Sequence, residues 1–372
     1  MKKTRAWMLA AGLVAALTLT SCASDAGGDT TPTDGGDATV DVTQYQAAAE
    51  KAMEPITEWP GPVDGPVAQD GVKVMWVSGG LASEGFKAPA DAAVEAADVL
   101  GWELNVADGQ FNPQIYNRLI QEAVDQNYDA IILNGITVEA VAESVKRARE
   151  AGIVVGSWDG GNLPSDVGVS FEVEYPVYEQ GVALASYLIW QAGGNANGYF
   201  VEAPEYNIIM EWVGGARDTF EECATCTVVR TDQFTAADHD TRLPSMVTSA
   251  LRSNPDINVF VGGYDAALYA TIPAMRSAGF EDVLIGSFNA NQRMAQFIRD
   301  GEASASVAEP FAWGAWASFD NLNRIVAGEE PADQGIPFRL ITAENVSDIE
   351  PNTNWDGDID FKTHFTEIWT GK

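Results

Sequence analysis

The feature that most constrains the fold of this chain is an alternation of short β-rich runs with helical segments, which begins at Val72. The run from Val72 to Val77 predicts a buried strand, and the alanine-rich segment from Ala88 to Leu100 predicts an amphipathic helix that ends at Gly101. Strands that alternate with helices form parallel sheets through right-handed crossovers. The first half of the pattern predicts strands at 72–77, 102–107, 130–133 and 153–155, and helices at 88–100, 113–126 and 138–151.

The same alternation restarts at Pro176, so the chain predicts two consecutive open α/β halves. The predicted fold class is α/β, with two doubly wound parallel-sheet lobes. Open parallel sheets bind ligands at the carboxyl ends of their strands, and two facing lobes enclose a cleft that closes by hinge motion. The second half predicts strands at 198–201, 227–230, 259–261, 283–285 and 305–307, and helices at 176–191, 208–223, 241–252, 266–278, 292–299 and 313–327.

The first 22 residues have the pattern of an export signal. Lys2, Lys3 and Arg5 form a basic start, and the uncharged segment 6–19 is too short and too weakly bounded for a good membrane span. The run Leu-Thr-Ser-Cys that ends at Cys22 resembles the lipobox of bacterial lipoproteins, in which the cysteine becomes a lipidated N-terminus. Acyl chains there would anchor the protein stably to a bilayer. The prediction is a signal peptide at 1–22 and an extracytoplasmic, lipid-anchored or periplasmic protein; the alternative is an uncleaved membrane anchor.

Residues 23–71 are predicted to be a flexible tether and an N-terminal extension. Residues 23–39 consist almost entirely of Ser, Asp, Gly, Thr, Ala and Pro, a composition that does not bury enough apolar surface to fold. Residues 45–56 have the composition of a short helix, after which four prolines between positions 55 and 66 interrupt regular structure. The folded body is therefore expected to begin near Val72.

The charge balance excludes nucleic acid as a partner. The chain has 54 acidic and 21 basic residues, and removal of the signal takes away three basic residues and no acidic ones. That leaves 18 basic against 54 acidic residues, a net charge of −36, which repels phosphate backbones. The acidity is typical of a solvated surface, and the alternative is an acidic patch that attracts cationic ligands or a basic transporter face.

Two further cysteines, Cys223 and Cys226, occur as Cys-Ala-Thr-Cys where a predicted helix leads into a strand. Outside the cytoplasm this spacing favours a local disulfide. A redox pair would be expected at the start of a helix, and a zinc site would need two further ligands that the neighbouring sequence does not supply. Redox chemistry remains the alternative, and no metal is expected.

Motifs at the strand ends give a resemblance to a known family. In the first half these are residues 74–85, 92–101, 129–133 and 151–155; in the second half they are 254–256, 264–267, 279–280 and 285–288. Together they resemble the type I periplasmic sugar-binding proteins of ABC importers, in particular the ribose-binding members. The resemblance covers 72–328 and implies the fold known as periplasmic binding protein-like I, with a three-crossover hinge. The first lobe would comprise 72–172 and 309–338, the second 173–308 and 339–372, with hinge crossovers near 171–174, 309–310 and 337–339.

The resemblance implies a ligand site at the strand ends. Asp159 corresponds to a sugar-chelating aspartate, His239 to a stacking phenylalanine, and Glu309 to a hinge glutamine. Asp265 lies beside the usual asparagine position, which is Tyr264 here, and Asn289 replaces an aspartate. The predicted ligand-binding residues are Ser83, Glu84, Phe86, Trp158, Asp159, His239, Asp265, Asn289 and Glu309.

The chain departs from the family pattern where the family has two arginines, because Gly160 and Gly214 occupy these positions. Carboxylates accept several hydrogen bonds from hydroxyl groups and suit a sugar or polyol, while aromatic rings cover the apolar side of a sugar ring. Carboxylates without a basic partner also suit an amine or other cation. Each of these residues has a structural alternative. Phe86 and Trp158 are then packing residues, and Asp159 and Asp265 are turn or cap residues. Glu309 is then a solvated hinge residue, and His239 a surface or capping residue.

Motifs for enzymatic chemistry are missing. There is no Gly-x-Ser-x-Gly elbow and no phosphate-binding loop, and the two histidines, His239 and His364, are far apart in sequence. The acidic segment 352–360 lacks the glycine register and closing glutamate of a calcium loop, so an ordinary acidic loop is expected there and calcium binding is the alternative. The prediction is therefore a monomeric, cofactor-free solute receptor that delivers a sugar or polyol to an ABC permease. The alternatives are a binding module that feeds a membrane sensor or a non-sugar importer, and an extracellular glycosidase with a carboxylate pair.

Overall fold

The computed structural model describes residues 40–165, 168–173 and 175–372. The predicted signal peptide, the lipidation site Cys22 and the first part of the tether lie outside the described residues. Within the described part of the chain, no helix combines the length and the apolar character needed to cross a membrane.

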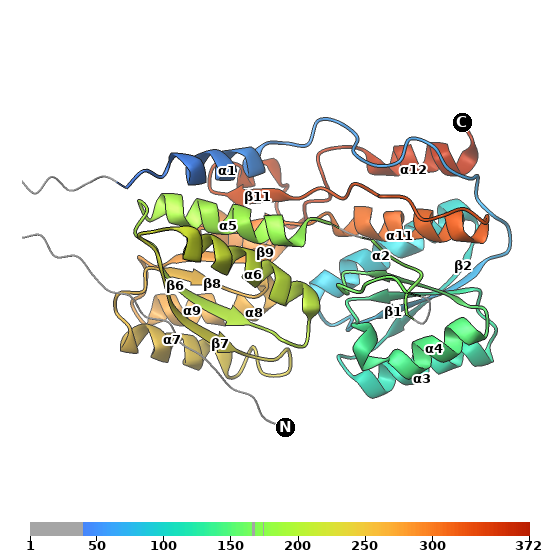
Figure 1. Ribbon diagram of the computed structural model, residues 1–372, viewed down its shortest axis with the longest axis horizontal. Helices are drawn as coiled ribbons and strands as arrows, with labels where there is room; N and C mark the ends of the chain where they lie inside the picture. The colour runs from blue at the N-terminus through green and yellow to red at the C-terminus, as the bar shows by residue number, and fades with distance from the viewer. Residues whose placement is uncertain (1–39, 166–167, 174) are drawn as a thin grey trace, which may run out of the picture. The chain divides into compact units, whose positions relative to one another are not determined.

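The first lobe is built on a five-stranded sheet in the order β2-β1-β3-β4-β5, in which all neighbouring strands are parallel. Helices α2 and α11 cover one face and helices α3 and α4 the other (Figure 1). The central strands β1 and β3 are buried because both faces are covered. The strands are β1 (Lys73–Ser78), β2 (Glu103–Asp108), β3 (Ala130–Asn134), β4 (Val154–Trp158) and β5 (Phe171–Val173); the helices are α2 (Glu84–Leu100), α3 (Pro113–Asp125), α4 (Ala142–Glu150) and α11 (Phe311–Val326).

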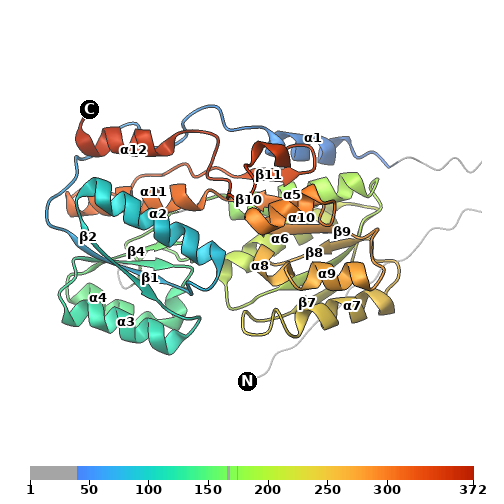
Figure 2. The same ribbon diagram turned by 180° about the vertical axis from the view of Figure 1, so that it is seen from behind.

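The second lobe has a six-stranded sheet in the order β11-β10-β9-β8-β6-β7, parallel except for the β10–β11 pair. Helices α5 and α6 lie on one face, α7 and α9 on the other (Figures 1 and 2). The strands are β6 (Asn197–Glu202), β7 (Thr227–Gln233), β8 (Val259–Val261), β9 (Leu284–Asn289), β10 (Ala305–Ala308) and β11 (Arg339–Thr342). The helices are α5 (Val177–Gln191), α6 (Asn207–Glu222), α7 (Leu243–Ser253), α8 (Asp265–Leu268), α9 (Thr271–Ser277) and α10 (Gln292–Arg299). The predicted fold class is confirmed.

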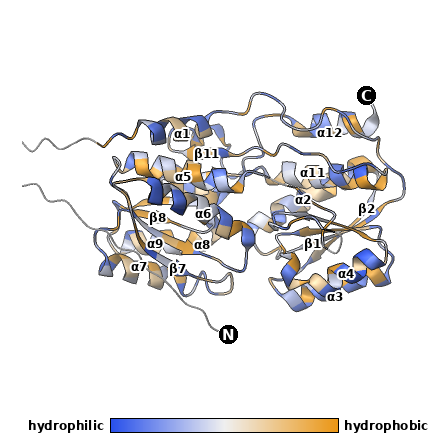
Figure 3. Cartoon of the chain, viewed as in Figure 1, coloured by the Kyte–Doolittle hydropathy of each residue, from blue (hydrophilic) through white to orange (hydrophobic). Residues whose placement is uncertain are grey.

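The outer helices α3, α4 and α7 carry both hydrophilic and hydrophobic residues (Figure 3). Most predicted elements occur in the structure with small changes at their ends. Two differences affect the ligand site. Helix α2 begins at Glu84, four residues before the predicted start at Ala88, and Pro89 lies inside the helix. The helix predicted for 266–278 is broken into α8 and α9, and Tyr269 lies at the break.

The ends of the described chain depart from the predicted lobe boundaries. Helix α1 (Thr43–Met53), in the predicted extension, buries Tyr45, Ala49 and Met53 in the core of the second lobe. Helix α12 (Phe361–Thr370), predicted for the second lobe, instead buries Phe361, Phe365 and Trp369 in the core of the first. Both helices carry apolar residues at every fourth position, and this stripe requires a covered face.

The chain therefore passes between the lobes five times in its described part, against the three predicted crossovers. The two additional connections run from α1 to β1 and from the second lobe to α12 (Figure 2). Trp59, on the first of these, stacks between Trp313 and His364, with ring centroids 5.0 and 4.3 Å away. The buried Arg339 joins both connections, since it donates to the Met53 carbonyl (2.9 Å) and pairs with Asp358 (3.2 Å).

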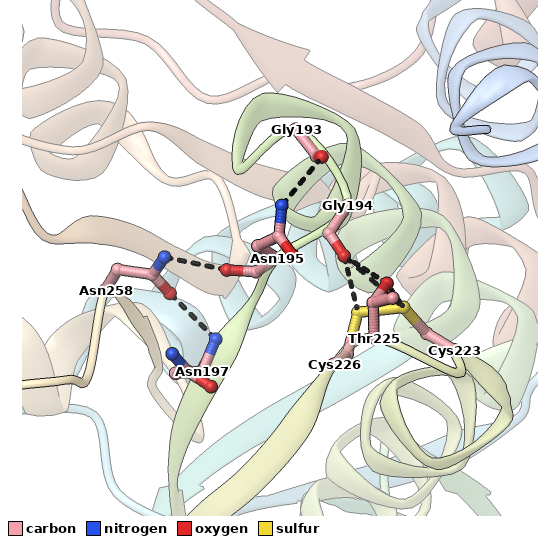
Figure 4. Close-up of a disulfide and its surroundings, with 8 residues drawn as sticks. All are labelled: Gly193, Gly194, Asn195, Asn197, Cys223, Thr225, Cys226 and Asn258. Atoms are coloured by element: carbon pink, nitrogen blue, oxygen red, sulfur yellow. Dashed lines mark hydrogen bonds between the residues drawn. A yellow bond between two sulfur atoms is a disulfide. The ribbon is translucent and has the colours of Figure 1, made fainter. Parts of the chain in front are cut away.

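A disulfide links Cys223 and Cys226 between α6 and β7. The Thr225 hydroxyl donates to the Gly194 carbonyl, toward which both sulfur atoms also lie (Figure 4). The disulfide therefore closes the turn from α6 into β7, and the hydrogen bond of Thr225 holds this turn against the one that follows α5.

Replacing both cysteines, Cys223→Ser with Cys226→Ser, is expected to lower the free energy of unfolding by about 2 kcal/mol. The reason is the short closed loop, with a sequence separation of 3, which restricts the unfolded chain only modestly. Urea unfolding of the oxidised protein and the double variant measures this difference. Equal midpoints would show that the disulfide does not stabilise the fold.

Candidate functional site

A cavity of about 450 Å³ lies between the two lobes, at the carboxyl ends of their parallel strands. This is the location that open α/β sheets favour, because the loops after the strands converge there. Both lobes contribute side chains. The lining residues are Ala82, Ser83, Glu84, Gly85, Phe86, Phe111, Gly135, Asp159 and Phe311 from the first lobe, and Tyr206, Ile208, Ile209, Trp212, Ala236, His239, Asp240, Tyr264, Ala266, Tyr269, Asn289, Asn291 and Arg293 from the second.

Six of the predicted residues line this cavity. Ser83, Glu84 and Phe86 lie at the start of α2, and Asp159 directly follows β4. His239 precedes α7, and Asn289 ends β9. The structure brings these six side chains together from four segments of the sequence: Ser83, Glu84, Phe86, Asp159, His239 and Asn289.

Trp158 belongs to the core of the first lobe and does not line the cavity, which corrects its predicted role as an aromatic ligand surface. Its side chain is fully buried, 5.1 Å from the ring of Tyr175. A side chain at position 314 of α11 would collide with the Trp158 ring, so Gly314 permits this packing. Successive residues of a strand face opposite sides, which separates Trp158 from the cavity-lining Asp159.

Asp265 lies behind the cavity wall, and this too corrects the prediction of direct ligand contact. Its buried carboxylate accepts hydrogen bonds from the backbone N–H of Asn291 and from the Ser306 hydroxyl, both at 2.9 Å. Burial raises the pKa of Asp265 to about 7. Asp265 therefore holds the backbone of Asn291, which lines the cavity.

Glu309 also lies behind the wall, on the crossover between β10 and α11, with 1% of its surface exposed. Its carboxylate accepts a hydrogen bond of 3.1 Å from the side-chain amide of Asn289, which does line the cavity. Burial and the neighbouring Asp159 raise the pKa of Glu309 well above its usual range. Glu309 is therefore a buried acid and not the solvated hinge residue of the alternative.

Asp159 connects the cavity to a second hinge segment, because it lines the cavity and contacts Tyr175. Its backbone is in the left-handed region (φ 59°), which is rare for residues other than glycine and is typical of functional sites. The Tyr175 hydroxyl, on the crossover between β5 and α5, donates to the Asp159 carboxylate. Burial raises the pKa of Asp159 to about 7. Asn289, at the corresponding strand end of the second lobe, also has a positive φ (99°).

Glu172 is a third acid in this region. Its carboxylate accepts hydrogen bonds from the backbone N–H groups of Gly160 (3.0 Å) and Gly161 (3.2 Å), which hold the loop after Asp159 in place. Burial raises the pKa of Glu172 to about 7, and the nearby Asp159 contributes to the shift. Asp159, Glu172 and Glu309 are hereafter called the acidic hinge cluster.

Sequence reasoning missed most of the aromatic lining, including Tyr206, Trp212 and Tyr269. It also missed Arg293, on α10, whose guanidinium lies 4.4 Å from the centre of the Tyr269 ring. Trp212 and Arg293 are on helices and Tyr206 and Tyr269 lie at helix ends, so the orientation of each helix decides which side chains meet the cleft. The available signal was the position of Tyr206 and Arg293 at the first turns of helices that follow strands.

A smaller cavity of about 250 Å³ adjoins the first and shares Phe111, Gly135, Tyr206 and Ala236 with it. It extends toward Tyr116 of the first lobe and Glu205 of the second. The space between the lobes is therefore longer than the main cavity alone.

The acidic segment 352–360 has structural roles. Asp358 pairs with Arg339, and the Asp360 side chain accepts from the Thr363 N–H at the start of α12. Across the described residues, no group of three or more His, Cys, Asp and Glu side chains is arranged to hold a metal ion.

Comparison with known proteins identifies the family. A family model described as "Periplasmic binding protein domain" matches residues 74–330. The chain belongs to this periplasmic binding protein family. The D-apiose import binding protein of Paraburkholderia graminis is 25% identical over 288 residues, which cover 71% of this chain and 85% of that protein. The ribose import binding protein of Escherichia coli is 23% identical over 261 residues, which cover 68% of this chain and 85% of that protein.

Solved structures of periplasmic binding proteins share the fold. The Caulobacter myo-inositol binding protein, solved with myo-inositol, gives a TM-score of 0.68 at 20% identity and covers 77% of this chain and 97% of that one. A solute-binding protein of Actinobacillus succinogenes with bound D-allose gives a TM-score of 0.67 at 19% identity. The match covers 75% of this chain and 100% of that one. The expected relationship to type I periplasmic sugar-binding proteins is confirmed, and members of this family are transport binding proteins.

Proposed function

We propose that this periplasmic binding protein is the extracytoplasmic receptor of an ABC importer and binds a sugar or polyol between its lobes. It would be exported by the signal at 1–22, anchored through lipid on Cys22, and would act as a monomer that delivers its solute to a membrane permease. The D-apiose and ribose import binding proteins among its relatives support the transport role.

The observation that carries the solute class is the composition of the cavity wall. Asp159 and Glu84 offer carboxylate acceptors for hydroxyl groups, and Asn289 and Asn291 offer amides. Phe86, in the same wall, offers a ring face for the C–H side of a sugar. This combination of a few polar groups in an aromatic cavity is typical of small-molecule sites.

Ligand capture would use the hinge. Tyr175 and Glu309 lie on two of the crossovers, and each contacts a cavity residue at a strand end, Asp159 and Asn289 respectively. Closure of the lobes around a solute would therefore be coupled to the hydrogen bonds of the cavity floor. The closed surface would be the form that the permease recognises.

A thermal-shift screen of the purified protein against pentoses, hexoses, polyols, amino acids and nucleosides tests the proposal. A solute present at 100 times its dissociation constant stabilises the fold by about 2.7 kcal/mol, and we expect a rise of several degrees in melting temperature. Sugars or polyols are expected among the hits. Hits confined to amino acids or nucleosides, or no hits at all, would contradict the proposed solute class.

A further inference from the structure

The acidic hinge cluster lacks positive partners. In the described part of the chain, no Lys, Arg or His side chain forms an ion pair with Asp159, Glu172 or Glu309. One buried carboxylate oxygen of Glu309, Oε1, and one of Glu172, Oε2, also have no hydrogen-bond partner there. Glu309 is thus buried, Asp159 and Glu172 are half-buried, and none of the three acids has a counter-charge.

Two buried acids that do not line the cavity have basic partners, whereas Asp265, behind the cavity wall, has only neutral hydrogen-bond donors. Asp320, with no exposed side-chain surface, pairs with Arg324 at 2.7 Å, and Glu202, with 6% exposed, pairs with Arg217 at 2.6 Å. A buried charge without a partner is strongly unfavourable. The unpaired acids are therefore a feature of the cavity region, where a ligand is able to supply the missing charge.

The basic groups of the cavity wall do not neutralise the cluster. The Arg293 guanidinium lies over the Tyr269 ring and donates to the Tyr269 carbonyl (3.3 Å). His239 is 2.9 Å from the Tyr264 hydroxyl and 3.4 Å from Asp240, a different acid. Tyr206 and Trp212 add ring faces, which also attract cations.

We propose that the solute is an amine-bearing sugar or polyol whose ammonium group binds at Asp159, with Glu309 and Glu172 behind it. This inference rests on the proposed carbohydrate-binding function and narrows its solute class. The hydroxyl groups of such a solute bind the amides and Glu84, and the ammonium supplies the counter-charge that the acidic hinge cluster lacks. Because Glu309 and Tyr175 lie on the crossovers, the same charge favours the closed arrangement of the hinge.

Matched pairs of solutes that differ only in the amine test this inference. The pairs are D-glucosamine with D-glucose, D-galactosamine with D-galactose, and N-methyl-D-glucamine with D-sorbitol, measured by isothermal titration calorimetry. We expect the amine member of at least one pair to bind roughly 10- to 100-fold tighter, as for hydrogen bonds to charged groups. Equal or tighter binding of the neutral member in every pair that binds would overturn the inference and leave the carbohydrate function standing.

A variant of Glu309 isolates the contribution of the negative charge that lies behind the cavity wall. Glu309→Gln removes the charge but keeps an oxygen to accept from the Asn289 amide. The ratio of amine to neutral affinity is expected to fall at least severalfold in this variant. Asp98→Asn, an exposed residue on the same helix as Glu84, removes an equal charge and should keep the wild-type ratio. An unchanged ratio in Glu309→Gln would overturn the assigned role of the cluster, and absence of any carbohydrate binding would contradict both proposals.

Discussion

Asp159→Asn is expected to weaken binding of the solute by about 100-fold while the unliganded protein stays folded. The carboxylate lines the cavity and would accept more than one charge-assisted hydrogen bond, each of which contributes about 1.5–3 kcal/mol. Asparagine tolerates the left-handed backbone at this position and keeps an oxygen for the Tyr175 hydroxyl. Calorimetric titration with the best solute from the screen measures the loss.

Asp265→Ala provides the contrasting control. Asp265 lies outside the cavity and satisfies two buried donors, the Asn291 N–H and the Ser306 hydroxyl. Its removal is expected to reduce the free energy of unfolding by about 2–4 kcal/mol, because unsatisfied buried groups are costly. Wild-type affinity in Asp159→Asn would remove Asp159 from the binding site. A loss of affinity in Asp265→Ala without a loss of stability would mean that Asp265 contacts the solute directly.

The contrast between these two acids shows how far sequence can locate a site. Asp159 and Asn289 follow strands, and the end of a parallel strand has a fixed place at the cleft edge, so their positions were predictable. Trp158 and Asp265 are adjacent to cavity residues in sequence but point elsewhere. That difference depends on side-chain direction at the strand end and on packing with α11 and β10, which local sequence does not specify.

The terminal helices show a similar limit for the fold. The spacing of Tyr45, Ala49 and Met53 indicates a helix with one buried face, and so does the spacing of Phe361, Phe365 and Trp369. The spacing does not indicate which lobe covers each face. That choice depends on contacts between segments more than 250 residues apart, such as the hydrogen bond of Arg339 with Met53. The two additional connections between the lobes were therefore not predictable from the residues alone.

The unliganded protein is expected to lose stability as the pH rises from about 5 to 8. Burial raises the pKa of Asp159, Glu172 and Asp265 to about 7, whereas carboxyl groups in an unfolded chain titrate near 4. Between these values the folded state binds protons that the unfolded state does not, so stability falls with pH and levels off above about 7. Since Asp159 and Glu172 are partly exposed, we expect a total change of roughly 2–5 kcal/mol.

Urea unfolding at pH 5, 6, 7 and 8 and constant ionic strength measures this slope. Surface acids of this negatively charged protein also repel one another more as the pH rises, so a variant is needed to isolate the buried groups. The double variant Asp159→Asn with Glu172→Gln should show a clearly shallower slope, whereas the exposed pair Asp98→Asn with Asp125→Asn should keep that of the wild type. Stability that rises between pH 5 and 8 would contradict the buried, protonated state of these acids.

A bound ammonium solute should reverse part of this dependence. Its positive charge favours the ionised form of Asp159 and lowers the pKa of that group in the complex. Binding of N-methyl-D-glucamine, whose amine stays protonated over this range, should then release a proton and strengthen as the pH rises from 6 to 8. D-sorbitol, which carries no charge, should not strengthen over the same interval. The pH dependence of these two affinities thus connects the buried acids of the hinge to the chemistry of the solute.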